Sequence, residues 1–201
     1  MIMKVDKMSL NHQNGITSQW HKLISDAQAA NGIDLELPLE SYLVHTLIQY
    51  TQRPEIAARI FAIDYMLAQH ENGQVRNNQL RELADQCLLY AGLFPQHAKR
   101  RHVRVSYYVD IGRSAYFELA SIGTPWSNIF SEISNNFVTL MDTLLSIHHL
   151  NNDESDNYIL DPELALQTWQ DTQSQQALKI LQQQTQSTNI VDFSGYKKKK
   201  H

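Results

Sequence analysis

Apolar residues recur every three to four positions along most of the chain, which is the period of an α-helix with one buried face. Proline and Asn-Gly pairs separate the repeats, as expected at helix starts and stops. The pattern predicts helices that begin near Thr17 or Ser18, at Pro38, at Pro54, near Val75 and near Trp126, with a shorter one at Asp161-Pro162-Glu163.

Two of these helices carry expectations about particular residues. The helix that follows Pro54 is expected to bury Ile56, Ile60, Ile63 and Leu67. The longest repeat runs from Trp126 to His148, and it predicts one continuous central helix with a stripe of aromatic and aliphatic residues. Such a stripe must pack against other helices, because its burial provides several kcal/mol at about 25 cal/mol per Å².

Residues 103–109 fit two structures. Val103, Val105, Tyr107 and Val109 alternate as they would in a strand, whereas the spacing from Val105 to Tyr116 also fits a helix. A lone strand would leave its backbone hydrogen bonds unsatisfied, because the rest of the chain offers no partner strand. We therefore predict a helix.

The predicted fold is all-α, a single compact bundle or array of five to six main helices with disordered ends. Only seven glycines and five prolines occur in 201 residues, fewer than a many-stranded fold would use in its turns. Residues 1–15 are interpreted as a mobile leader and 16–170 as the helical domain. Residues 171–201 form a Gln-rich tail, partly helical around Leu178 and Leu181 and disordered toward its basic end.

The cysteine count and the apolar runs of the sequence indicate in which cellular compartment the protein works. Cys87 is the only cysteine, so the chain can form no intramolecular disulfide. The N-terminus lacks the apolar run of a signal peptide, and no stretch of about eighteen apolar residues could span a membrane. These features favour a cytoplasmic protein.

Charge is distributed unevenly along the chain. Residues 93–116 hold five basic residues and one acidic residue, a net charge of +4, and Lys197–Lys200 add the same amount. Because the whole chain carries −4, the remainder carries −12. Such segregation indicates either an anionic partner for the basic segments or docking of the tail on the acidic body.

No motif for catalysis, a cofactor or a metal is present. The chain has no Gly-rich phosphate loop and no nucleophile motif, and no histidine has a glutamate three residues before it, as helix-bundle metal sites require. His148 and His149 are adjacent, so on a helix they point about 100° apart. We predict no cofactor and no metal, and whether the chain catalyses a reaction is left open.

Three carboxylates interrupt apolar runs, where an ionised group is costly unless it is paired. Asp64, Asp85 and Asp110 each have a structural explanation: Arg81 precedes Asp85 by four residues, Arg113 follows Asp110 by three, and Asp64 fits the edge of its helix. The functional alternative is that these carboxylates and Arg113 line a polar cleft between helices, together with hydroxyls from Tyr107, Tyr108 or Tyr116.

The basic segment that contains Arg100, Arg101 and Arg104 is followed by Tyr107 and Tyr108. Arginines next to aromatic rings could bind phosphates and stack on a planar group, although a short Arg-rich turn often only forms salt bridges.

The run from Glu82 to Pro95, continued by Val105 to Tyr116, resembles helical proteins of gammaproteobacteria that have no assigned activity. The resemblance covers residues 35–150 and implies a bacterial, cytosolic protein. It implies no catalytic residue and no ligand.

The leading hypothesis from the sequence is a noncatalytic adaptor that contacts an acidic protein partner through Arg100, Arg101 and Arg104. The first alternative is an enzyme or small-ligand protein that uses the polar cleft. The second alternative is nucleic-acid binding through the basic segments, with steep salt dependence. The sequence leaves the oligomeric state open.

Overall fold

A computed structural model describes residues 7–52, 61–151 and 160–188. Within these ranges the chain forms ten helices and no strand, so the all-α prediction is confirmed and the predicted count of five to six main helices is wrong. The helices are α1 (Lys7–Asn31), α2 (Leu37–Gln52), α3 (Phe61–His70), α4 (Gly73–Gly92), α5 (Gln96–Arg100), α6 (Val105–Ala120), α7 (Ser127–Asn135), α8 (Phe137–Asn151), α9 (Pro162–Thr172) and α10 (Gln175–Thr188).

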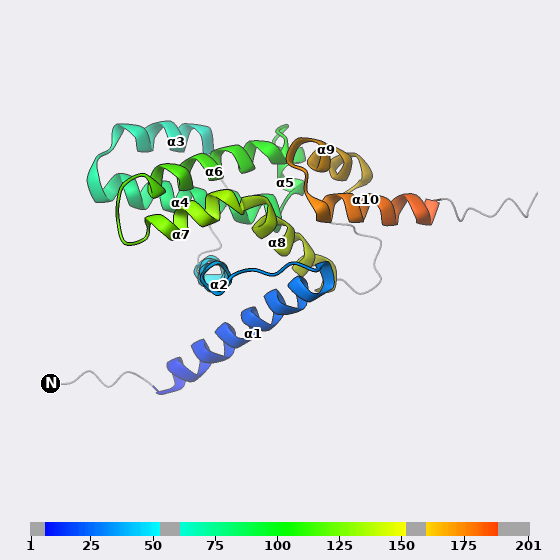
Figure 1. The fold of residues 1–201 in the computed structure, drawn as a ribbon, viewed down its shortest axis with the longest axis horizontal. Helices are drawn as coiled ribbons and strands as arrows, with labels where there is room; N and C mark the ends of the chain where they lie inside the picture. The colour runs from blue at the N-terminus through cyan, green and yellow to red at the C-terminus, as the bar shows by residue number, and fades with distance from the viewer. Residues whose placement is uncertain (1–6, 53–60, 152–159, 189–201) are drawn as a thin grey trace, which may run out of the picture.

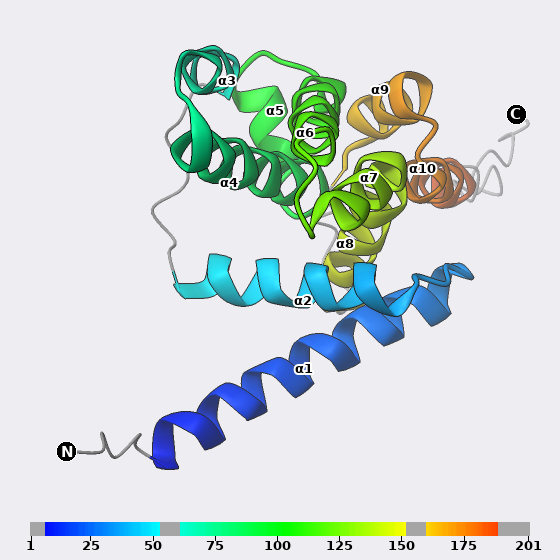
Figure 2. The same ribbon diagram turned by 60° about the vertical axis from the view of Figure 1, so that its left-hand side comes forward.

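Helices α4 and α6 form the centre of the molecule and pack along each other (Figure 1). Helix α3 covers one side of this pair, and α7 and α8 pack against the other. Figure 2 shows α1 and α2 as a separate layer, which packs on the rest mainly through α8 and α7. Helices α9 and α10 pack together beside α6 and α8.

The single long helix predicted for residues 126–148 is two helices. Asn136 lies between α7 and α8, and both its backbone N–H and its side-chain amide donate to the carbonyl of Glu132, at 2.9 Å each. A side chain that bonds its own helix backbone in this way competes with the regular helical ladder. The predicted stripe also fails at its start, because Trp126 is 66% exposed.

Two other helices differ from their sequence patterns. Helix α1 begins at Lys7, ten residues before the expected start, so Asn14-Gly15 lies inside it. In α3, Ile63 and Leu67 were predicted to be buried but are 51% and 58% exposed, whereas Phe61 and Ala68 face the core. Pro54, Ile56 and Ile60 lie outside the described residues. Because α3 is apolar on several sides, periodicity alone selected the wrong face.

The helix predicted at residues 103–109 is confirmed from Val105, where α6 begins, whereas Arg104 before it is extended. Its neighbour α4 ends at Gly92, which lies close to α8. A Cβ atom placed there would lie 2.5 Å from Leu144 Cβ and 3.1 Å from the carbonyl oxygen of Met141. The glycine therefore allows α4 and α8 to approach closely.

A buried carboxylate fixes the start of α10. Asp142 of α8 accepts hydrogen bonds from the Ser174 hydroxyl and from the backbone N–H of Gln175 and Gln176, at 2.9 and 3.4 Å for the two amides. Burial raises the pKa of Asp142 to about 6, and these hydrogen bonds oppose the increase. Helix α10 thus has a polar anchor in addition to its buried Ala177 and Ile180.

The C-terminal region only partly lies within the described residues. Leu178 and Leu181, the apolar anchors predicted for residues 171–188, are half-buried in α10. Residues 189–201, with the four lysines, lie outside the described ranges, so the basic tail stays a prediction. None of the described helices combines the length and the apolarity needed to cross a membrane.

Replacing Gly92 with alanine should destabilise the protein by about 1–3 kcal/mol, because the new methyl group would push α8 away from α4. The matched control is Gly15→Ala, since nothing lies within 4 Å of a Cβ at that position in α1. The control should be neutral or gain up to about 1 kcal/mol from helix propensity. Urea unfolding measures both changes, and equal stability of the two variants would contradict the tight α4–α8 contact.

Asp142 should make stability depend on pH in a defined direction. Its pKa of about 6 in the folded protein exceeds the value of about 3.9 in an unfolded chain, so the folded state binds the proton more tightly. The resulting stabilisation is complete below about pH 4 and is lost as pH rises through about 6, an effect on the order of 3 kcal/mol.

The measurement is the difference in unfolding free energy between the wild type and Asp142→Asn from pH 4 to 7. Other titrating groups are common to both proteins and cancel in this difference. The wild type should lose stability relative to the variant as pH rises, whereas a pH-independent difference would show that Asp142 has an ordinary pKa.

Candidate functional site

The four residues proposed for a polar cleft lie in different surroundings. Asp85 is 9% exposed within α4, and Asp64 is half-buried on α3. Asp110 and Arg113 are both exposed on α6. Of these four residues, Asp85 alone lines the cleft between α2 and α4 that is described below.

The basic segment contacts acidic residues of the same chain. Lys99 donates to Asp161 at 2.7 Å and lies 3.7 Å from Glu163, and the hydrogen bond to Asp161 raises the Lys99 pKa. Arg104 donates to both carboxylate oxygens of Asp171, at 3.0 and 3.1 Å. Helix α9 and the residue before it therefore supply counter-charges for this segment. Arg100 and Arg101 are exposed at the end of α5.

The two tyrosines after the basic segment take part in the packing of α3. Tyr107 accepts a hydrogen bond from the backbone N–H of Ala62 at 2.9 Å through its hydroxyl oxygen. Tyr108 is buried, stacks on Tyr90 and meets Phe61 edge-on. Burial raises the pKa of Tyr108 to about 12. Tyr108 thus belongs to the core, and Tyr107 fixes the start of α3.

Asp85 joins three helices through its carboxylate. Its Oδ1 atom accepts hydrogen bonds from the hydroxyls of Tyr42 on α2 and Tyr116 on α6, both at 2.6 Å. Its Oδ2 atom lies 3.8 Å from Nε of Arg81, the partner predicted from the i, i+4 spacing. The Arg81 guanidinium also lies over the Tyr42 ring, 5.5 Å from its centroid.

The electrostatics of this group follow from its burial. Burial raises the pKa of Asp85, while the hydroxyls of Tyr116 and Tyr42 and the charge of Arg81 oppose the increase. Burial and the neighbouring carboxylate raise the pKa of both tyrosines well above the ordinary value. The tyrosines therefore stay hydrogen-bond donors, and Asp85 is the acceptor.

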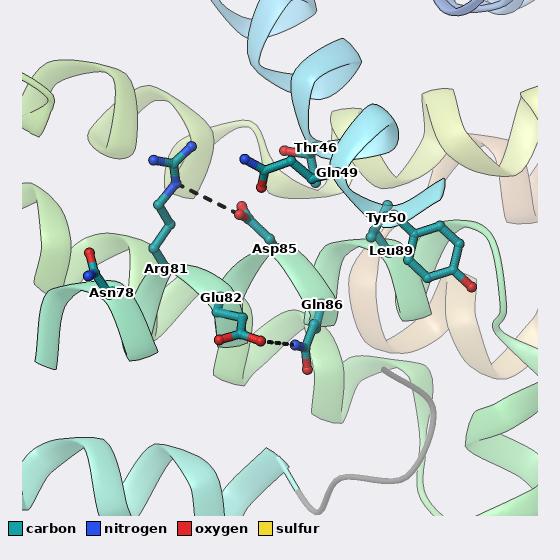
Figure 3. A pocket seen from close by; sticks show the side chains of 9 residues that line it. All are labelled: Thr46, Gln49, Tyr50, Asn78, Arg81, Glu82, Asp85, Gln86 and Leu89. Carbon is teal, nitrogen blue, oxygen red and sulfur yellow. Dashed lines mark hydrogen bonds and ion pairs between the residues drawn. The ribbon is translucent and has the colours of Figure 1, made fainter. Parts of the chain in front are cut away.

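A cleft of about 190 Å³ opens beside Asp85, between α2 and α4. Figure 3 shows Arg81 and Asp85 facing each other, with Thr46 and Gln49 reaching toward them from α2 and Glu82 bonded to Gln86 along α4. The lining residues are Thr46, Gln49, Tyr50, Asn78, Arg81, Glu82, Asp85, Gln86 and Leu89. Those from α4 recur every three to four positions, so one face of that helix forms the cleft wall.

Gln86 contributes a buried acceptor without a partner. Its side chain is 2% exposed, and Nε2 donates to Glu82 Oε1 at 3.3 Å. Its Oε1 atom is buried and has no hydrogen-bond partner. Buried polar atoms of this kind normally have a partner, and leaving one unpaired costs about 1–3 kcal/mol. The wall of the cleft therefore contains one buried acceptor, Gln86 Oε1, that receives no hydrogen bond from the described residues.

Sequence reasoning selected Asp85 but missed Gln86 and its neighbours. A signal was present, because Asn78, Glu82 and Gln86 are polar at intervals of four residues along α4. Leu80 and Leu83, which lie between them in sequence, and Leu88, which follows, are buried on the other faces. A stripe of polar residues on an otherwise apolar helix is expected where that face of the helix lines a water-accessible cleft.

A second cavity lies between α1 and α2. It has a volume of about 380 Å³ and is lined by Ile16, Thr17, His21, Ser41, Val44, His45 and Ile48. His21, one of these lining residues, forms a hydrogen bond with Glu40 through Nδ1 at 2.8 Å. This cavity is larger, but unlike the α2–α4 cleft it contains no buried charge.

The α2–α4 cleft has no Ser- or Cys-based nucleophile among its lining residues. Its nine lining residues include no Cys, His or Ser, and the Thr46 hydroxyl donates to the carbonyl of Tyr42 at 3.0 Å. A hydroxyl or thiol nucleophile needs a base next to it, and the Thr46 hydroxyl is bonded to the backbone instead. Within the described ranges, no three His, Cys, Asp or Glu side chains are grouped so that they could hold a metal ion.

Replacing Asp85 with alanine should destabilise the protein by about 2–4 kcal/mol, because the hydroxyls of Tyr42 and Tyr116 would lose their acceptor in a buried place. Asp85→Asn keeps an oxygen at that position and should cost about 1 kcal/mol. Asp110→Ala removes an exposed carboxylate from α6 and should change stability by less than about 0.5 kcal/mol. Urea unfolding at pH 7 should rank the variants in this order, and an Asp85→Ala variant as stable as Asp110→Ala would exclude a structural role for Asp85.

Comparison of the chain with protein-family models, with curated proteins and with solved structures gave no match. The resemblance to helical gammaproteobacterial proteins therefore stays an expectation from the sequence.

Proposed function

We propose that the protein binds a small amine-bearing molecule in the cleft between α2 and α4. The observation that carries the proposal is that two buried acceptor side chains line one cleft: Gln86, whose Oε1 atom has no hydrogen-bond partner, and Asp85, whose carboxylate is buried. Both groups accept hydrogen bonds, and an ammonium group supplies several donors and a positive charge.

The charges of the cleft support this choice of ligand. Asp85 and Glu82 bring two carboxylates, and Arg81 brings one guanidinium, so the wall is acidic overall. Arg81 could in addition receive a carboxylate or another acceptor from the ligand, as in an amino acid. Tyr50 and Leu89 provide an apolar part of the wall for a short carbon chain.

The size of the cleft limits the ligand. Its volume of about 190 Å³ is below the roughly 300–1,000 Å³ of pockets for drug-sized ligands. A compound with a few carbon atoms and one or two polar groups matches this space. The cleft is too small for a nucleotide or a peptide.

The adaptor hypothesis stays a prediction with less support. It relied on Arg100, Arg101 and Arg104, and Arg104 bonds Asp171 within the chain. Lys99 is likewise paired with Asp161. An acidic protein or a nucleic acid would have to displace these contacts, and their surface exposure makes that inexpensive.

Binding can be tested by following protein NMR shifts during titration with n-butylamine, 1,4-diaminobutane and L-lysine. Butyrate is the negative control ligand, since it has the same number of carbon atoms as butylamine and the opposite charge. The amines should shift signals from α2 and α4, and butyrate should not. Gln86→Leu removes the unpaired acceptor and should weaken amine binding about five- to tenfold, which corresponds to about 1–1.4 kcal/mol.

Gln173→Leu is the control variant, because Gln173 is an exposed glutamine at the end of α9, outside the cleft. It should bind the amines as the wild type does. The proposal fails if no amine shifts α2 or α4, or if Gln86→Leu and Gln173→Leu bind amines equally well.

A further inference from the structure

The cavity between α1 and α2 is separate from the proposed amine site, because the two share no lining residue. Figure 2 shows that α1 and α2 run in opposite directions, meet where they are connected and diverge toward their other ends. The cavity lies between them and has a volume of about 380 Å³. Pockets that hold drug-sized ligands have volumes of about 300–1,000 Å³, so this cavity has room for a small organic molecule.

The cavity has a polar end and an apolar end. His21 and Ser41 lie at the polar end, beside the contact between His21 and Glu40 that joins the two helices. Ile16 lies five residues back along α1, and Ile48 lies seven residues further along α2. Because the helices are antiparallel, both isoleucines lie in the same direction from His21, about 8–10 Å away at 1.5 Å per residue.

A chain of hydrogen bonds fixes the state of the His21 ring. The backbone N–H of Leu35 donates to Gln28 Oε1 at 2.7 Å, so the amide nitrogen of Gln28 is the end that donates to Glu40 Oε2, at 3.2 Å. The other oxygen of Glu40, Oε1, lies 2.8 Å from Nδ1 of His21. A carboxylate only accepts hydrogen bonds, so Nδ1 carries the proton in this contact, and Nε2 of the neutral ring is an acceptor.

The composition of the wall favours a neutral ligand that donates one hydrogen bond. His21 lines the cavity and Glu40 does not, so the ring edge with Nε2 is the part left for a ligand. The seven lining residues include no Asp, Glu, Lys or Arg to pair with an ionic ligand. An anion would need the protonated ring, whose charge Glu40 already balances.

We propose that the α1–α2 cavity binds a neutral phenol, whose hydroxyl donates to Nε2 of His21 and whose ring packs against Ile16, Val44 and Ile48. A phenol donates a stronger hydrogen bond than an aliphatic alcohol, and its flat ring enters the narrowing space between two helices. Apolar walls with a few placed polar groups are the usual composition of such sites. Glu40 is a positioning residue, because it acts through the tautomer of His21.

Protein NMR shifts during titration with 4-ethylphenol test the proposal on the full chain. The phenol should shift signals from the facing parts of α1 and α2, whereas the amine site is expected to report through α2 and α4. The matched ligand is 4-ethylanisole, which has the same ring and a methyl ether in place of the donor. It should bind about five- to tenfold more weakly, since one hydrogen bond is lost. The anion 4-ethylbenzoate should cause no shifts.

Two variants test the roles of the imidazole and of its carboxylate. His21→Phe keeps a flat ring and removes Nε2, so it should bind 4-ethylphenol and 4-ethylanisole equally well. That comparison is made within one protein, so a change in the stability of the variant does not affect it. Glu40→Gln supplies an amide that can donate to Nδ1, which would turn Nε2 into a donor and weaken phenol binding. His70→Phe is the control, because His70 is exposed at the end of α3.

Four results would overturn the phenol site. The first is a titration in which 4-ethylphenol shifts no signal of α1 or α2. The second is equal binding of 4-ethylphenol and 4-ethylanisole to the wild type, which would leave an apolar cavity without hydroxyl recognition. The third is a preference for the phenol that persists in His21→Phe. The fourth is tighter binding of 4-ethylbenzoate than of 4-ethylphenol, which would make the cavity an anion site.

Discussion

The buried carboxylate of Asp85 is the interaction on which the arrangement of the helices depends. It lies on α4 and binds the hydroxyls of Tyr42 on α2 and Tyr116 on α6, so one group fixes the positions of three helices. A carboxylate in such a place is tolerated only because it is hydrogen-bonded and has Arg81 nearby. The rings of Tyr42 and Tyr116 also meet each other and Phe130, which gives the polar link an apolar surround.

The cleft is a consequence of this way of attaching α2. Helix α2 packs mainly on α1 and α7, and it reaches α4 through the hydroxyl of Tyr42. A polar contact between two helices does not close the space beside it as interdigitated apolar side chains would. Polar residues of α2 and α4 therefore line a gap next to Asp85, and the same feature that holds the fold together produces the candidate site.

Local patterns in the sequence were enough to predict the helical class, the helix at residues 103–109 and the Arg81–Asp85 pair, since all three depend on spacings of three or four residues. Tyr116 was among the tyrosines expected near the carboxylates, and it does donate to Asp85. Tyr42 was not predictable as the second donor, because it is 43 residues away from Asp85 in sequence. The anchor of α10 was missed for the same reason, since Asp142 and Ser174 are 32 residues apart. The break at Asn136 was missed because the apolar period continues across it, and the buried face of α3 because that helix is apolar on several sides.

Most of the prominent charges of the described chain find their partners within it. Lys99 and Arg104 meet acidic residues before and within α9, Arg76 meets Glu118, and Asp85 meets two hydroxyls and Arg81. Exposed ion pairs of this kind contribute only about 0–1 kcal/mol each, so they position segments of the chain without making it rigid. Lys99 and Arg104 in this way hold the region around α9 to the α5–α6 corner. Five buried side-chain atoms of the described residues have no hydrogen-bond partner, and of these Gln86 Oε1 belongs to a residue that lines the α2–α4 cleft.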